Sequence, residues 1–354
     1  MKSVRSVLSI LVLAGMLSGA GAQAANPPQK SAPAKKTPKS APKANPPGAA
    51  QTILTPIDDA GHTRAPNLCP DLSSCIDSIL ANAGQFDMRN TMEAMWRMQQ
   101  FPAQKRGLGQ TSGEWQKRAR ATLEAGDLKG ALDLLRAALT INPGNELLHI
   151  ELGMMLLQSG DLAQAERSFQ QALQLIPWRT QAWEGLALNY QAQAQDDKAA
   201  AALAVAWEWA MNKSAYKAAL AGKTKQAMYA KALELINRRN EQTIAAWEKV
   251  RQDNLQAPAD WRQPVLIERE GFQCNAPQYP MQALRNGEEG TVQMDFLLEQ
   301  NGLVLDTRIS QSSGVNDLDA AARLSLATCF GVRVPPQGLG GRILLSTRYV
   351  WKLE

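Results

Sequence analysis

A 34-residue internal period in the middle of the chain constrains its fold more than any other feature. Trp115 recurs as His149 and Trp183, and the turn residue Gly126 recurs as Gly160. Small or apolar residues fill the other equivalent positions: Ala119, Gly153 and Ala187; Ala131, Ala165 and Ala199; Leu135, Phe169 and Leu203; Ala138, Ala172 and Ala206. Small residues let paired antiparallel helices approach closely, and each pair buries its apolar face only against its neighbours. The period therefore predicts an all-α stack of helical pairs.

These spacings and residue types resemble the tetratricopeptide repeat (TPR) family over residues 112 to about 212. The third copy departs from the pattern, with Ala194-Gln195 in place of the Gly-Asp turn and Met211 in place of the final proline. The last repeat of such an array needs a capping helix to cover its exposed apolar face. The helical stretch that follows the third copy is predicted to be that helix. The repeats with their capping helix are predicted to span residues 112–254.

The first helix of each repeat is predicted to line a concave binding groove. Six side chains are expected there: Arg120, Met154, Leu157, Gln158, Leu188 and Gln191. The alternative is that preceding helices bury them.

Beyond Pro258 the helical pattern gives way to strand patterns. Residues 291–300 alternate apolar and polar side chains, Asn301-Gly302 predicts a two-residue hairpin turn, and a returning strand follows. An apolar helix face comes next, and a final strand runs through Ile343–Trp351. Residues 262–354 are thus predicted to form a small α+β domain with a three-stranded antiparallel sheet.

Over residues 272–354 this domain resembles the C-terminal domain of TonB family proteins. The residues that carry the resemblance are Tyr279-Pro280, Ala283, Gly287, Gly290-Thr291-Val292, Phe296, Asn301-Gly302, Ser312-Ser313-Gly314, Leu318-Asp319, Ala321-Ala322, Phe330 and Pro335. The resemblance implies that the domain binds a short extended segment of an outer-membrane TonB-dependent transporter by adding it to the sheet as a strand.

The last strand is the candidate edge for such binding, because an edge offers unpaired backbone N–H and C=O groups. Alternate residues of that strand are the predicted peptide-binding positions: Arg342, Leu344, Ser346, Arg348, Val350 and Lys352. Two alternatives stay open. In the first, Arg348 and Lys352 are charges that keep an ordinary edge strand from pairing with other chains. In the second, another copy of the domain covers the edge.

The N-terminus has the charged, apolar and small-residue order of a secretory signal over residues 1–24. Residues 25–66 are rich in Pro, Ala and Lys and predict a disordered linker, and residues 67–111 predict a helical segment. The linker is either a solubilising spacer or a cationic contact for an anionic cell wall or membrane surface. Export places the mature chain in the periplasm.

The net charge of +5 does not indicate a nucleic-acid partner. Its seven Lys and Arg residues before residue 50 leave the rest of the chain at −2, without the basic footprint of a nucleic-acid binder. The four cysteines of an exported chain favour disulfides. We expect Cys69 to pair with Cys75, and Cys274 with Cys329, because each pair then stays within one folded unit. The rival metal site lacks a Cys-x-x-Cys motif or a nearby His pair.

No catalytic constellation is recognisable, so we expect no enzyme, cofactor or metal. The only histidines are His62 and His149, and His149 occupies a repeat position that favours packing. Turn chemistry explains Ser312-Ser313-Gly314. Three functions remain: a periplasmic adaptor that binds proteins or peptides, a TonB-like transducer anchored in the inner membrane that serves transmembrane transport, and, remotely, an enzyme. Energy-transducing TonB proteins keep a membrane helix containing a His, and the segment 1–24 has none.

Overall fold

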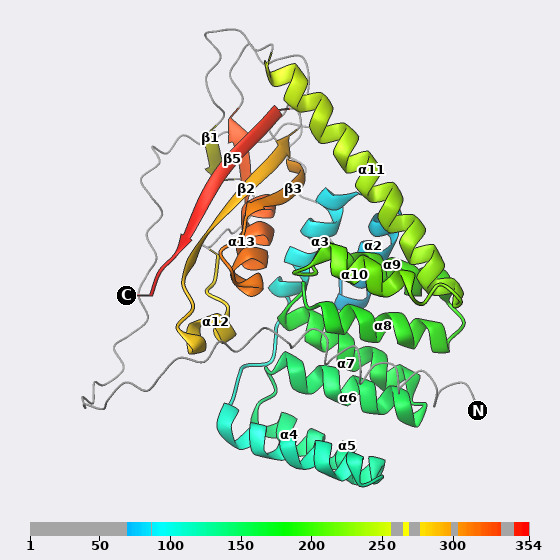
Figure 1. The fold of residues 1–354 in the computed structure, drawn as a ribbon. Helices are drawn as coiled ribbons and strands as arrows, with labels where there is room; N and C mark the ends of the chain where they lie inside the picture. The colour runs from blue at the N-terminus through cyan, green and yellow to red at the C-terminus, as the bar shows by residue number, and fades with distance from the viewer. Residues whose placement is uncertain are drawn as a thin grey trace, which may run out of the picture. The chain divides into compact units, whose positions relative to one another are not determined.

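The computed structural model describes residues 69–85, 87–255, 265–268, 277–298, 304–333 and 343–353. The predicted signal and linker, Cys274, the turn at 301–302 and Arg342 lie outside these ranges. The helices that precede the sheet are α2 (Leu72–Gln85), α3 (Met88–Gln100), α4 (Gly109–Glu124), α5 (Leu128–Ile141), α6 (Glu146–Ser159), α7 (Leu162–Leu175), α8 (Thr180–Ala192), α9 (Asp196–Glu208), α10 (Lys213–Ala221) and α11 (Ala227–Leu255) (Figure 1).

The predicted repeats are present as the helical pairs α4–α5, α6–α7 and α8–α9 (Figure 1). The first two pairs share one turn chemistry. Gly126 and Gly160 adopt left-handed φ angles of +89° and +85°, and the aspartate that follows each glycine accepts a hydrogen bond from a backbone N–H of the second helix. The third pair departs from this pattern as predicted, because Ala194 takes the left-handed position and no side chain caps α9.

Residues at equivalent positions of the second and third repeats make the same contact. Trp183 Nε1 donates to the carbonyl of Pro177 at 2.8 Å, and His149 Nε2 lies 2.8 Å from the carbonyl of Pro143. Each ring thus reaches the proline carbonyl six residues before it. Burial lowers the pKa of His149. The prediction that His149 is a packing residue is confirmed.

Phe169 fills the space between the second and third repeats and is fully buried. Gly153 of α6 and Gly185 of α8 both face its ring: a Cβ on Gly153 would lie 2.7 Å from Phe169 Cε1, and a Cβ on Gly185 would overlap the same ring. The two glycines therefore allow one aromatic ring to occupy the crossing of two helices.

The C-terminal part holds β1 (Val265–Glu268), α12 (Met281–Asn286), β2 (Gly290–Leu298), β3 (Val304–Gln311), α13 (Asn316–Cys329), β4 (Phe330–Arg333) and β5 (Ile343–Trp351). The predicted three-stranded antiparallel sheet is present, in the order β3-β2-β5. α13 packs against β2 and β3 (Figure 1). A separate antiparallel pair, β1 with β4, was not predicted from the sequence.

The N-terminal segment forms a helical hairpin of α2 and α3. The predicted Cys69–Cys75 disulfide is confirmed and closes the start of α2, with a Cα–Cα distance of 4.9 Å. Asp87 caps α3 through its side chain. α2 packs on α7 and α9, while α3 packs on α7, α13 and β3. The hairpin thus contacts both the repeats and the C-terminal sheet.

Candidate binding surfaces

β5 forms an open edge of the sheet. It pairs with β2 on one side over the continuous register from Gly290↔Trp351 to Leu298↔Ile343, and no described strand pairs with its other side. In an antiparallel pair, alternate residues direct their backbone groups away from the partner strand. β5 therefore presents a row of backbone donors and acceptors that the described residues leave without a strand partner.

The opposite edge of the sheet, β3, is covered. α3 of the N-terminal hairpin contacts this strand, and the hydroxyl of Thr307 lies 3.8 Å from the sulfur of Met92. Thr307 is also buried. β5 in turn contacts α11, which packs against Leu344 through Trp247 and Val250.

The predicted peptide-binding side chains of β5 fall into two groups. Leu344 packs against the cluster formed by Trp247, Val250 and Leu297, and the hydroxyl of Ser346 donates to Asp295 Oδ1 at 2.6 Å. Ser346 is itself exposed. The second group is also exposed and consists of Arg348 and Val350 of β5 and of Lys352, just after its end, with Val350 52% accessible. The first group contacts the rest of the domain, whereas the second group is exposed.

Aromatic packing anchors the end of β5. Trp351 is buried and makes edge-to-face contacts with Tyr279 and Tyr349, with ring centroids 5.0 and 4.9 Å away. Such pairs stabilise by about 0.5–1.5 kcal/mol each beyond their burial. The edge is therefore fixed in position before a partner arrives.

The predicted groove residues are only partly available. Arg120 pairs with Glu151, which also accepts from Gln116 at 2.7 Å, and Gln158 is exposed. Met154 is half-buried. These three positions lie on the first two repeats.

Three of the predicted groove residues, Leu157 on the second repeat and Leu188 and Gln191 on the third, are engaged within the chain. Leu157 and Leu188 are only 4% and 6% exposed, and Gln191 Nε2 donates to Gln226 Oε1, just before α11, at 2.9 Å. Burial also raises the pKa of Glu184 on the same helix. Leu157 and Leu188 are therefore buried, which is the alternative that the sequence left open.

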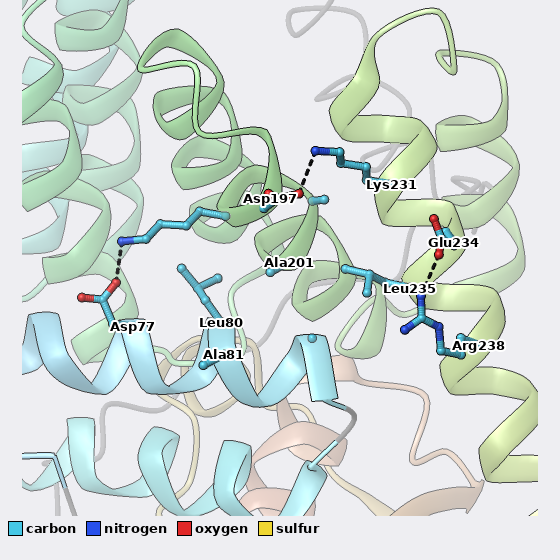
Figure 2. A pocket seen from close by; sticks show the side chains of 12 residues that line it. Asp77, Leu80, Ala81, Asp197, Ala201, Lys231, Glu234, Leu235 and Arg238 are labelled. Carbon is cyan, nitrogen blue, oxygen red and sulfur yellow. Dashed lines mark hydrogen bonds and ion pairs between the residues drawn. The ribbon is translucent and has the colours of Figure 1, made fainter.

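A cleft of about 710 Å³ between α2, α9 and α11 was not predicted from the sequence. Figure 2 shows its apolar side chains, among them Leu80, Ala201 and Leu235, with charged side chains around them at the rim. The rim ion pairs are Asp77–Lys198 at 2.8 Å, Asp197–Lys231 at 2.7 Å and Glu234–Arg238 at 2.7 Å. The cleft joins helices far apart in the chain, which no local pattern indicates.

A buried polar junction joins the repeats to the C-terminal domain. Arg323 of α13 donates to Glu208 Oε1 at 2.6 Å and to Thr307 Oγ1 at 2.7 Å, and its guanidinium lies 4.7 Å from the Trp209 ring centroid. Burial opposes ionisation of Glu208, but Lys213, Arg323 and Arg239 outweigh it and hold its pKa well below the usual range. The junction therefore contains a buried carboxylate whose charge is balanced by cations from both domains.

Two further contacts extend this junction. Asp306 of β3 accepts from Arg239 at 2.7 Å and from Trp247 Nε1 at 3.1 Å, both on α11. Asp317 of α13 accepts from Trp178 Nε1 at 3.2 Å and pairs with Arg179 at 3.3 Å, both between α7 and α8. Because α11 also caps the repeats, one helix contacts both domains.

No group of three metal-ligating side chains occurs among the described residues. The serine run is a turn, as predicted: the Ser313 backbone N–H donates to Asp319 Oδ1 at 2.8 Å, and the Ser312 hydroxyl donates to Asp319 Oδ2 at 2.5 Å. The part of the chain that the structure describes also contains no helix with the length and apolar character that crossing a bilayer requires.

Helical repeats joined to an α+β domain whose strand β5 has no described strand on its outer side define a chain built from protein-interaction domains. Comparison with known families identifies both. Residues 275–351 match the model of the Gram-negative bacterial TonB protein C-terminal domain, and residues 122–168 and 156–222 match the tetratricopeptide repeat. Both resemblances inferred from the sequence are thereby confirmed. TonB-type domains belong to proteins of the cell envelope.

Solved structures of TPR proteins are similar to the helical part. The Sgt2 TPR domain from Aspergillus fumigatus is 20% identical, with a TM-score of 0.29, covering 45% of this chain and 92% of that one. A crystal structure of MamA is 15% identical, with a TM-score of 0.28, covering 47% of this chain and 95% of that one. No curated protein matches the chain.

Proposed function

We propose that the chain is a non-enzymatic periplasmic adaptor that binds an extended peptide as an added strand at β5 and holds a second protein through its repeats. The observation that carries this proposal is the difference between the two sheet edges. Both edge strands contact a helix, β3 through α3 and β5 through α11, but on β3 the buried Arg323 already donates to the backbone carbonyl of Thr307, whereas β5 has no strand partner among the described residues on its outer side. Backbone hydrogen bonds give such a complex its affinity, and side-chain positions give it selectivity.

The family matches support this reading through the partner class they imply, which is protein. By resemblance, the peptide is a segment of an outer-membrane TonB-dependent transporter. The second partner is expected in the groove of the first two repeats, near Arg120, Met154 and Gln158.

Proline substitution at neighbouring β5 positions tests strand addition. Ser346 and Thr347 are adjacent, so one N–H faces β2 and the other faces away. Proline removes the N–H donor. We expect one of Ser346→Pro and Thr347→Pro to keep the thermal midpoint of the unaltered chain but to bind peptide about tenfold more weakly, in line with loss of a hydrogen bond and a clash of the ring.

The probes for this test are random ten-residue peptides displayed on phage and selected on the full chain, with affinities measured on the synthesised winners. Ser346→Ala controls for loss of the Asp295 contact. Unchanged peptide affinity in both folded proline variants, or failure to select any peptide, would rule out binding at β5.

A second candidate function is an inner-membrane-anchored transducer that serves outer-membrane transport. The TonB-type match and the Lys- and Pro-rich segment before residue 50 favour it. Replacing residues 1–24 with a signal that is certainly cleaved distinguishes the two functions. A transducer loses transport activity on release from the membrane, whereas the adaptor retains its activity.

A further inference from the structure

The side of the sheet that faces α11 is only half covered. Trp247 and Val250 of α11 pack on Leu297 and Leu344, at the end of the sheet where β5 begins. Further along the same side, Arg348 and Val350 of β5 are exposed, and Gln293, the register partner of Arg348, is half-buried. A strand added at β5 would extend this uncovered surface.

The negative charge of Asp295 on this surface is already satisfied. Asp295 accepts from Arg308 at 3.0 Å, from Ser310 at 3.2 Å and from Ser346 at 2.6 Å. Near the end of the sheet, Glu289 accepts from the backbone N–H of Leu353 at 2.6 Å. Asp295 is therefore balanced by a cation of its own sheet, whereas the described partner of Glu289 is a neutral backbone N–H.

Two basic side chains near this surface, in contrast, form no ion pair with a described residue. They are those of Arg348 in β5 and of Lys352, the residue that follows the end of β5. Both side chains are exposed, and they lie four residues apart in the sequence. Four residues of strand span about 13 Å. Residues i and i+4 of an added strand have the same spacing, so two acidic side chains can lie beside Arg348 and Lys352 at once.

We propose that β5 selects acidic strands: extended peptides with carboxylate side chains at positions i and i+4 and an apolar side chain between them at i+2, opposite Val350. This inference rests on the proposed function and adds the chemical class of the peptide to it. Opposite charges placed directly across a strand pair favour it, and like charges disfavour it. Exposed charges are screened by salt, so the selectivity weakens as ionic strength rises.

Three synthetic ten-residue peptides test the proposal. They share one alternating, β-branched sequence and differ only at two positions four residues apart, which are both Asp, both Ser or both Lys. Binding to the full chain is measured by fluorescence anisotropy at low and high salt. We expect the Asp peptide to bind about tenfold more tightly than the Lys peptide at low salt, with the Ser peptide between them.

The double variant Arg348→Glu with Lys352→Glu should reverse the order of the Asp and Lys peptides. The matched control is Lys117→Glu with Lys129→Glu, which makes the same change in net charge on exposed positions of α4 and α5. This control should keep the original order, since its charges lie in the first repeat.

Every other outcome contradicts the preference for acidic peptides. The outcomes differ in whether they also contradict strand addition at β5. Equal affinities for the three peptides would show that Arg348 and Lys352 only protect an edge from aggregation, while strand addition itself would stand. Reversal by the control variant would assign the preference to net charge. Failure of all three peptides to bind would remove both the acidic preference and the proposed function.

Discussion

Replacing Arg323 with alanine is expected to lower the free energy of unfolding by about 3–5 kcal/mol, the usual cost of removing one partner from a buried ion pair. The Arg323 side chain is 5% exposed and that of Glu208 is 9% exposed. Without Arg323, the Glu208 carboxylate keeps Lys213 as a cation, at 2.9 Å, but loses its most buried one. Urea unfolding of the full chain at neutral pH measures the change.

The matched control is Arg136→Ala, which removes the exposed Arg136–Asp133 pair on α5. An exposed pair of this kind contributes less than about 0.5 kcal/mol. Similar effects of the two substitutions would contradict the claim that the junction between the repeats and the C-terminal domain is buried and ionised.

The same junction predicts a pH dependence. A depressed folded-state pKa of Glu208 means that its contribution is complete above the unfolded value of 4.5 and is lost as the pH falls from 4.5 towards the folded-state pKa. The free energy of unfolding should therefore decrease on acidification below about pH 4.5. In Arg323→Ala the pKa of Glu208 rises, so this part of the curve should become shallower. Parallel curves would argue against the pairing.

Replacing Gly185 with alanine is expected to destabilise the chain by about 1–3 kcal/mol, although alanine is the better helix former. The new methyl group would overlap the Phe169 ring, which is fully buried between α6 and α8 and has no free space to move into. Thermal or urea unfolding reports the loss.

Two further variants separate crowding from helix propensity. Gly113→Ala lies in α4, where no atom comes within 4 Å of the added Cβ, and should stabilise by about 0.5–1 kcal/mol. Phe169→Leu should relieve the overlap, so the double variant with Gly185→Ala should lose less than the sum of the single changes. Additive losses would show that Gly185 and Phe169 do not share one packing site.

The repeats were predictable because the residues that determine each one lie close together in the sequence. A helical pair and its turn lie within 34 residues, so the recurrence of Gly126 as Gly160 and of Trp115 as Trp183 is visible in the sequence. The strands β2 and β5 were predictable for the same reason, since the alternation of apolar and polar residues, broken in β2 only at Leu297, is a local property. The edge position of β5 then followed from the family resemblance.

The polar junction was not predictable in this way. Arg323 and Glu208 lie 115 residues apart in the sequence. Charged residues are usually exposed, so the local pattern of either helix predicts an exposed side chain at these positions. The β1–β4 pair, which joins Val265 to Arg333, has the same difficulty. Leu157 and Leu188 were assigned to an open groove because helical register gives the direction of a side chain but not what covers it.

Amide hydrogen exchange of the full chain, with and without a selected ten-residue peptide, tests strand addition at β5 most directly. In the free chain, alternate amides of Leu344–Trp351 should exchange rapidly, because every second N–H points away from β2. Peptide binding should protect those amides and leave β3 unchanged. Protection confined to the repeats or to β3, with β5 still exchanging rapidly in the complex, would contradict the account.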